Sequence, residues 1–326
     1  MSQYADLSKR LYDYSLLNDF EKCERRGYWM AVRNKVSSAP SPAMHFGAAI
    51  HAGTDAWRKA NKNDQAGYDA YEHAFTGMPE DAKRTFEHGR LLLRGYFKRY
   101  VAEPFLVLAG EVTFVVPMAD GSKLVGRIDG VVRWGPYIYV LETKTTSSLG
   151  SEFMRQFKPN LQIDVYCYAV KRAFGQCDGA VIDAISTAKL KGGTEEGYLR
   201  DITDRTEDDL VAFGRYYQDR VAELERRVVL HDTAASRASE PIAAFPQRFA
   251  ACYYYGACPY LQLCLYRHEG PLESEYRDRQ QLEITDELGP IATRYLAAHA
   301  GLGTAGVPSG TSADRHGDRT SPQTGA

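Results

Sequence analysis

The chain has 326 residues, of which 44% are hydrophobic and 25% are charged, with a formal net charge of −2 and a pI near 6.5. This composition is ordinary for a water-soluble globular protein, and six cysteines are too few for a disulfide scaffold. Any nucleic acid would therefore be held by a local groove and not by a globally basic surface. No apolar run is long enough to span a membrane, and the first residues lack a signal-peptide core, so we expect a cytoplasmic protein without a membrane partner.

The first hundred residues read as helices. Ser15 is expected to cap a helix through LLNDFEKC, whose spacing turns Cys23 inward. A buried core thiol is the commoner explanation for such a cysteine. A second helix follows the loop SSAPSP, and its small residues GAA permit close packing just before His51. An imidazole placed there can ligate a metal, although a packed or capping histidine is the commoner case.

From Phe105 the hydrophobic period changes to two, which predicts strands. Apolar residues alternate from Val112 to Val116, and Asp120-Gly121 supplies a hairpin turn. Two apolar, β-branched runs then flank the letters WGPY in VGRIDGVVRWGPYIYVLETKTT and predict a second hairpin. Its loop is open to being longer than two residues, because proline is unusual in so tight a turn.

The second hairpin brings two acids together. A symmetric loop centred on Gly135-Pro136 sets Asp129 directly opposite Glu142. Opposed carboxylates, with Cβ atoms roughly 5 Å apart, are destabilising unless a cation lies between them. Lys144 projects from the same face as Glu142 because strand side chains alternate. Oxygen ligands beside an ammonium suit Mg²⁺ or Mn²⁺ and phosphodiester hydrolysis. The alternative is an exposed Glu-Lys pair with an unrelated aspartate.

A helix from about Pro159 to Phe174, with the proline in its first turn, should lead by a crossover to a fourth strand. Gln162 and Tyr166 are four residues apart and share one face of this helix. That face could line the cleft, with the amide bonding to water or phosphate and the phenol closing over it. A glutamine and a tyrosine on an amphipathic helix also need no function.

Beyond a charged helix over residues 206–228 the chain becomes rich in cysteine and tyrosine. Cys252, Cys258 and Cys264 have five residues between neighbours, which is not the short knuckle of a zinc ribbon. Three thiols make an incomplete tetrahedral set, and Cys23 is the natural fourth donor. Such a set would hold an iron-sulfur cluster or, less favourably, zinc. Buried thiols are an equally weighted alternative.

Together these features resemble the PD-(D/E)XK nuclease superfamily, in the RecB/AddB-like branch that includes the iron-sulfur CRISPR-associated exonucleases. The resemblance covers roughly residues 15 to 268. It rests on GAAIH, GRID, the triplet ETK, a Q-x-x-x-Y pair and the split cysteine set. It implies an α/β (α+β) fold with a restriction-endonuclease-like αβββαβ core, a mixed sheet flanked by helices, a helical N-terminal region and a cysteine-ligated C-terminal staple.

The resemblance also implies roles for these residues. His51, Asp129 and Glu142 would coordinate the metal with the backbone carbonyl of Thr143. Lys144 would position or polarise the attacking water, and Gln162 and Tyr166 would help to hold DNA. A structural four-iron four-sulfur cluster would be ligated by Cys23, Cys252, Cys258 and Cys264. The interval between Cys252 and Cys258 is longer than the C-x-x-C of many members.

We therefore predict one nuclease domain over residues 1–300, with a helical part (15–104), a catalytic core (105–203), a helix and cysteine part (204–268) and a disordered tail (301–326). The predicted activity is that of a metal-dependent DNA exonuclease acting on ends or single strands, in recombination, repair, or phage or CRISPR-type DNA processing. The alternative is a DNA-binding or assembly module without turnover. The chain has no G-x-x-x-x-G-K-[ST] loop, so any helicase or recombination partner would be a separate polypeptide.

Overall fold

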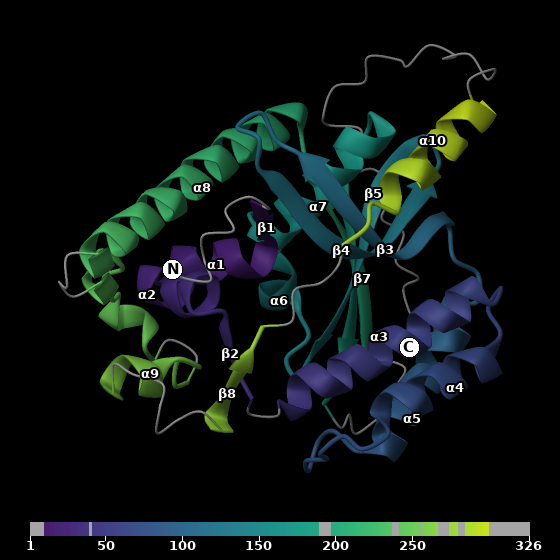
Figure 1. Ribbon diagram of the computed structural model, residues 1–326. Helices are drawn as coiled ribbons and strands as arrows, with labels where there is room; N and C mark the ends of the chain where they lie inside the picture. The colour runs from purple at the N-terminus through teal and green to yellow at the C-terminus, as the bar shows by residue number, and fades with distance from the viewer. Residues whose placement is uncertain are drawn as a thin grey trace.

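The computed structural model describes residues 10–38, 41–188, 197–236, 241–253, 256–266, 274–279 and 284–299. At its centre is a six-stranded mixed sheet in the order β1-β4-β5-β6-β7, with β3 paired to β4 (Figure 1). Its strands are β1 (Leu11–Asp13), β3 (Leu106–Pro117), β4 (Lys123–Trp134), β5 (Tyr137–Thr146), β6 (Gly179–Ser186) and β7 (Tyr198–Asp204). A separate antiparallel pair joins β2 (Lys35–Ser37) to β8 (Tyr276–Asp278).

Helices lie around this sheet. The α-helices are α1 (Tyr14–Lys22), α2 (Glu24–Gly27), α3 (Pro42–Lys59), α4 (Asp64–Phe75), α5 (Phe86–Tyr100), α6 (Ser151–Arg155), α7 (Leu161–Phe174), α8 (Glu207–Ser236), α9 (Leu261–Tyr266) and α10 (Leu288–His299). The other helical turns are η2 (Tyr28–Val32), η3 (Pro241–Ala244) and η4 (Phe249–Ala251). In Figure 1, α3, α4 and α5 gather on one side of the molecule, and α1, α2 and α9 lie on the opposite side. Within the described ranges, no helix is both long enough and apolar enough to cross a membrane.

The predicted α/β fold with a mixed sheet flanked by helices is confirmed. Strands β3, β4 and β5 form the expected antiparallel meander, and α7 crosses over to place β6 parallel to β5. The β4–β5 loop has the minimum length, because Trp134 pairs directly with Tyr137. Of the two loop lengths that the sequence left open, the structure has the shorter one. Gly135 adopts a φ of 61°, a left-handed conformation that glycine reaches without steric cost, and this permits the tight turn before Pro136.

Two helix starts differ from the sequence prediction. Helix α1 is capped by Asp13, whose carboxylate accepts the Leu16 N–H at 2.8 Å, whereas Ser15 lies inside the helix. Helix α7 is capped by Asn160, which accepts two N–H groups of the first turn, and Pro159 precedes the cap. In both cases the side chain that can reach the free N–H groups sets the boundary.

Several elements have too weak a hydrophobic pattern to be predicted from the sequence. Strand β1 has three residues and pairs in parallel with the start of β4. Strand β7, which extends the sheet beyond β6, and α10 were not predicted either. Helix α8 continues to Ser236, past the predicted end at residue 228. The predicted tail, residues 301–326, lies outside the described residues.

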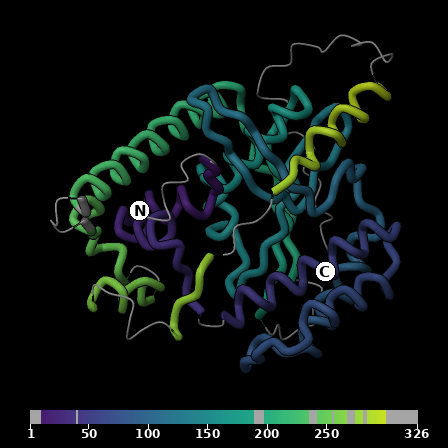
Figure 2. The backbone as a smooth tube through the Cα atoms, viewed as in Figure 1, coloured from purple at the N-terminus to yellow at the C-terminus, as the bar shows by residue number. Residues whose placement is uncertain are grey.

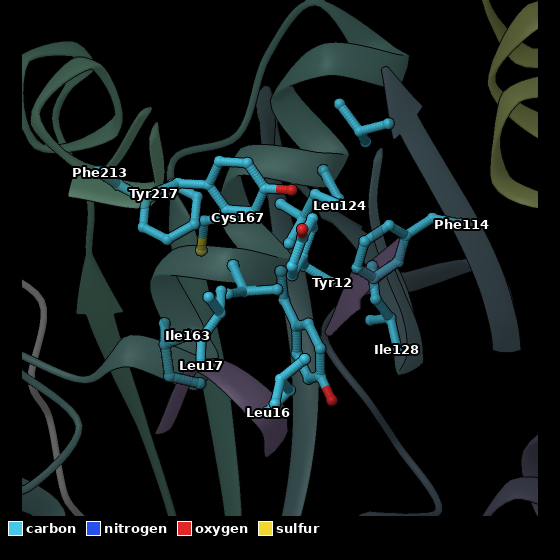
Figure 3. Packing of buried hydrophobic residues seen from close by; sticks show 14 of the residues in the cluster. Tyr12, Leu16, Leu17, Phe114, Leu124, Ile128, Ile163, Cys167, Phe213 and Tyr217 are labelled. Carbon is cyan, nitrogen blue, oxygen red and sulfur yellow. The ribbon is translucent and has the colours of Figure 1, made fainter. Parts of the chain in front are cut away.

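The two largest of the three apolar clusters among the described residues pack helices against the sheet. The larger one packs α1, α7 and α8 on one face of the sheet, around side chains such as Leu17, Ile128 and Tyr217 (Figure 3). The second lies among α3, α4 and α5 and reaches Ile185 of β6. On α5, Leu92, Tyr96 and Phe97 are buried in this cluster, whereas Leu91 is 48% exposed and does not join the core.

A buried ion network ties the second cluster to the sheet. Asp183 on β6 is fully buried, and its Oδ2 accepts hydrogen bonds from Arg58 at 2.7 Å and from Arg200 at 2.9 Å. Glu103 contacts both guanidinium groups. Because Arg58 lies on α3 and Arg200 on β7, this network fixes the helical side against the strands.

Candidate functional site

The site is built where β5 separates from β4. Strand β3 pairs with β4 along almost its whole length, and so occupies one edge of it. The other edge pairs with β1 over Lys123 to Val125 and with β5 from Gly130 onward. Asp129 therefore stands in the interval that neither strand covers. A side chain there has room to meet groups from several elements.

The predicted register between β4 and β5 is confirmed. Gly130 pairs with Leu141, and the next position of the same register sets Asp129 opposite Glu142. The strands part at this point, and the Asp129 carboxylate accepts the Thr143 N–H at 3.0 Å in place of a further backbone bond. This contact holds Asp129 against the residue whose carbonyl was predicted to face the metal.

His51 reaches the same carboxylate from α3. Its Nδ1 lies 3.3 Å from Asp129 Oδ2. Helix α3 can approach because Gly47 has no side chain, and a Cβ added there would lie 3.1 Å from Thr145 Oγ1 at the end of β5. The small residues before His51 thus have the packing role expected of them at Gly47.

Glu111 on β3 is a site residue that the sequence analysis missed. His51, Glu111 and Asp129 each offer one ligand atom, and these atoms all lie within 4.8 Å of one another. The β3–β4 pairs Gly110 with Gly130 and Val112 with Ile128 place Glu111 directly across from Asp129. Next to its loop, the paired residues of this hairpin have numbers that sum to 240, so the loop is centred on Asp120 alone. A count outward from Asp120-Gly121 would have set Val112, not Glu111, across from Asp129, which is why the sequence did not reveal Glu111.

The backbone of Glu111 also differs from that of its strand. Its φ is 46°, in the left-handed region that residues with a side chain seldom occupy. Such conformations persist where the surrounding structure holds them, often at functional sites. Its carboxylate lies 3.3 Å from the Nε of Arg127, whose side chain is 65% exposed. A largely exposed guanidinium therefore lies beside the acidic group.

Lys144 and Glu142 form the other half of the site. The Lys144 ammonium lies 2.5 Å from Glu142 Oε1 and donates to Gln162 Oε1 at 2.9 Å. The Gln162 amide in turn donates to the Tyr166 hydroxyl at 3.1 Å. The structure thus brings the predicted Gln162 and Tyr166 to the site, in a chain of contacts that ends on the lysine.

Burial and charge set the protonation of these groups. Burial, with the nearby Asp129 charge, raises the pKa of Glu142 to about 7. Burial lowers the pKa of Lys144, but its contact with Glu142 outweighs this, and the net pKa is raised. Burial also opposes the charge on Asp129, yet His51 and the Thr143 N–H lower its pKa overall. Without a metal, the crowded negative charge therefore raises the pKa of Glu142, whereas the pKa of Asp129 stays below its ordinary value.

The donors fit a hard divalent cation. Glu142 is 1% exposed, and its Oε2 is buried without a hydrogen-bond partner anywhere in the described part of the chain. An ionised carboxylate oxygen left in this state is costly, and a cation would relieve that cost. Carboxylate oxygens and one imidazole nitrogen are ligands that Mn²⁺ accepts, and carboxylates suit Mg²⁺.

The four predicted cysteine ligands also come together. Cys23, Cys252, Cys258 and Cys264 are free thiols and line one pocket between α2 and α9. The Trp29 indole N–H lies 3.4 Å from Cys264 Sγ, and the Arg248 backbone N–H lies 3.3 Å from Cys23 Sγ. Hydrogen bonds of this kind stabilise thiolate ligands. Figure 2 shows the light-green segment that contains α9 and β8 beside the N-terminal helices.

The remaining two cysteines lie elsewhere. Cys167 on α7 and Cys177 after it are buried in the larger core cluster. Burial, with the neighbouring Cys177, raises the pKa of Cys167 well above its ordinary value. Both thiols are therefore core residues. Neither lines the cysteine pocket, which agrees with the prediction of Cys23 as the fourth ligand.

Comparison with known proteins places the chain in a family. A candidate exonuclease from Eubacterium rectale is 16% identical, with a TM-score of 0.44 over 69% of this chain and 84% of that one. An alkaline exonuclease from Laribacter hongkongensis is 15% identical, with a TM-score of 0.33 over 60% of this chain and 100% of that one. No curated protein matches. A family model matches residues 14–265, a span that holds every site residue described above, and on this match the chain belongs to the PD-(D/E)XK nuclease superfamily.

Proposed function

We propose that this chain is a deoxyribonuclease that depends on Mg²⁺ or Mn²⁺ and hydrolyses phosphodiester bonds from DNA ends or in single strands. The observation that carries the proposal is the convergence of His51, Asp129 and Glu142 beside Lys144. The buried Glu142 Oε2 supports the proposal further, because no described residue donates a hydrogen bond to this atom and a cation could occupy the position beside it.

His51, Asp129 and Glu142 would hold the metal with the Thr143 carbonyl, and Glu111 adds a carboxylate from the neighbouring strand. A divalent ion held there supplies Lewis acidity to a phosphoryl oxygen and lowers the pKa of water. The protein contributes the geometry. The Thr143 N–H and the His51 ring hold Asp129 from two directions, so its free lone pairs keep a fixed orientation.

Lys144 acts as a cationic hydrogen-bond donor in this proposal. The raised pKa of Lys144, which arises from Glu142 against the opposing effect of burial, keeps the ammonium protonated near neutral pH. It can therefore orient a water molecule or stabilise the negative charge that develops on phosphorus oxygens, but it does not serve as a base.

Gln162 and Tyr166 are proposed to position Lys144. The Gln162 carbonyl oxygen accepts from Lys144, and its amide nitrogen is used by Tyr166. Tyr166 is 9% exposed, and its ring meets the edge of Phe114 in the core. A side chain so enclosed is better placed to hold Gln162 than to contact DNA. The role proposed for Tyr166 therefore differs from the DNA contact that the resemblance implies.

The four cysteines are proposed to ligate a structural four-iron four-sulfur cluster. Their thiols come from both ends of the matched region and meet in one pocket. A cluster there would fasten α9 and its flanking turns to α2. Anaerobically purified protein should then be brown, with absorption near about 400 nm. A colourless, folded preparation with stoichiometric zinc would contradict the cluster and leave the nuclease proposal in place.

The test of the nuclease proposal is digestion of end-labelled linear and circular single strands with Mg²⁺ or Mn²⁺. We expect linear DNA to be degraded and closed circles to persist. Glu142→Gln and Lys144→Met should abolish the cleavage. Glu152→Gln is a matched control, because Glu152 is an acid on the short helix α6 whose side chain is 83% exposed. Binding without cleavage under every metal would favour the alternative, an assembly module without turnover.

A further inference from the structure

Exposed apolar side chains gather beside the cysteine pocket. We call them the cysteine-flanking patch, and they are Phe249, Tyr253, Leu265 and Tyr266, which are 79%, 69%, 64% and 54% exposed. Tyr253 follows Cys252, and Leu265 follows Cys264, so the patch includes residues next in sequence to two cysteines that line the pocket. Large apolar side chains gathered at one exposed place mark a binding surface more often than scattered ones do.

The patch is not needed to cover the pocket or the core. In the same segment Tyr260 is 3% exposed and Leu263 is fully buried, and these side chains supply the packing. The Tyr260 hydroxyl donates to the Lys35 backbone carbonyl, which fixes its ring inward. The aromatic side chains of the patch point outward from a backbone that other residues already hold.

The charges around the patch favour an anionic partner. Residues 241–268 contain no aspartate or glutamate, although the chain has 42 acidic residues in 326. The segment contains Arg248 and Arg267. The Arg248 side chain is 52% exposed, and its guanidinium lies 4.0 Å from Glu24, at the limit of an ion pair. A phosphate backbone would meet a cation here, and no carboxylate of the segment would repel it.

We infer that the cysteine-flanking patch is a stacking platform for unpaired DNA bases. Single-stranded DNA has both features that the patch can use: planar base faces for Phe249, Tyr253 and Tyr266, and phosphates for Arg248. Paired bases in a duplex do not expose their faces in this way. The inference rests on the proposed function, because it gives that nuclease a second contact with its single-stranded substrate, at the cysteine end of the chain.

The experiment measures binding without cleavage. A fluorescein-labelled oligothymidylate is titrated with the full chain in EDTA, and the dissociation constant is read from fluorescence anisotropy. Stacking on one aromatic residue changes the affinity of a base by about 5- to 150-fold. We expect Phe249→Ala and Tyr253→Ala to weaken binding by about tenfold each. Tyr253→Phe should stay within about twofold of the wild type, because phenylalanine keeps the stacking face.

Two controls separate stacking from loss of folding. Tyr137→Ala removes an exposed tyrosine at the tip of the β4–β5 hairpin, and it should leave the dissociation constant unchanged. The unmodified protein is also titrated with an abasic oligomer that keeps the phosphates. It should bind this oligomer at least tenfold more weakly than oligothymidylate, a result that needs no variant to fold.

The outcomes also distinguish this inference from the proposed function. Hydrolysis of bis(p-nitrophenyl) phosphate, a diester too small to reach the patch, reports the metal site alone and should be equal in the patch variants and the wild type. Full affinity of the alanine variants, or equal binding of the abasic oligomer, would overturn the platform and leave the patch to a protein partner. Base-dependent binding without hydrolysis of either substrate would keep the platform and contradict the nuclease proposal.

Discussion

Glu111 on β3 lies across from Asp129 on β4, so that the central aspartate has a carboxylate on each side, Glu111 from one neighbouring strand and Glu142 from the other. Of these two flanking carboxylates, only that of Glu111 belongs, with His51 and Asp129, to the compact group of ligand atoms. Asp129 is therefore shared by two sets of donors that approach it from opposite edges of its strand.

Removal of the Glu111 carboxylate should weaken metal binding. We expect Glu111→Gln to raise the dissociation constant for Mn²⁺ by about 10- to 100-fold, the range found when groups around a metal are removed. Isothermal titration calorimetry on the metal-free protein measures this directly. Glu152→Gln serves again as the exposed control. An unchanged Mn²⁺ affinity in Glu111→Gln would show that Glu111 is not a ligand and that its contact with Arg127 is its role.

Metal affinity should rise with pH and then level off. Burial and the Asp129 charge raise the pKa of Glu142 to about 7, so a proton occupies this carboxylate below that pH. Because metal binding must displace the proton, the Mn²⁺ dissociation constant should fall by up to about tenfold per pH unit below 7 and change little above it. His51 adds to the effect, since Asp129 raises its pKa despite burial. Calorimetry at several pH values gives this profile.

The raised pKa of Glu142 also predicts how the stability of the metal-free fold changes with pH. The folded pKa of Glu142 is raised above its unfolded value near 4.5, so the metal-free fold binds more protons than the unfolded chain between these values. The contribution of Glu142 to stability is complete below the unfolded pKa and is lost as the pH rises through about 7. Urea unfolding in EDTA should show Glu142→Gln gaining stability relative to the wild type from pH 5 to pH 8. No gain at pH 8 would contradict the raised pKa.

Much of the site was predictable because turn geometry fixes strand register. Counting outward from Gly135-Pro136 gave the register that the pairs from Trp134–Tyr137 to Gly130–Leu141 confirm, and alternation placed Lys144 beside Glu142. The same rule applied to the first hairpin would have missed Glu111, because that loop is centred on Asp120 alone and a count from Asp120-Gly121 sets Val112 across from Asp129. The ion network of Arg58, Asp183 and Arg200 lay beyond such counting, because its members come from α3, β6 and β7, and β7 itself was not predicted.

The position of Lys144 should depend on Gln162. Gln162→Leu removes the acceptor 2.9 Å from the Lys144 ammonium and leaves Glu142 as the remaining partner of that ammonium within the described chain. We expect kcat to fall by about 10- to 100-fold with KM nearly unchanged, because the lysine loses orientation while DNA binding is retained. Gln162→Glu should restore part of kcat, since it keeps the acceptor. A rise in KM alone would instead assign Gln162 to DNA binding, as the resemblance first implied.

The cysteine set should stabilise the fold as a unit. Cys264→Ser removes a thiol that accepts a hydrogen bond from the Trp29 indole N–H and lines the shared pocket. If the four thiols hold one cluster, this change and Cys252→Ser should each abolish absorption near about 400 nm and lower the melting temperature by similar amounts. The double variant should then lower it little further, because either change already removes the cluster. Cys177→Ser, outside the pocket, should keep the absorption. Additive losses without any absorption would indicate independent thiols.

The buried network around Asp183 should be the most sensitive structural point outside the site. Asp183→Ala leaves the guanidinium groups of Arg58 and Arg200, 2.7 and 2.9 Å from its carboxylate, without this partner in a region closed to water. Breaking a buried ion pair from one side costs about 3–5 kcal/mol, and urea unfolding should show a loss of that size. Asp201→Ala, at an exposed position on β7, should change the free energy of unfolding by less than about 1 kcal/mol. Because Arg58 lies on the same helix as His51, the Asp183→Ala protein should also bind Mn²⁺ more weakly. Equal unfolding free energies for the two variants would show that Glu103 alone compensates both arginines.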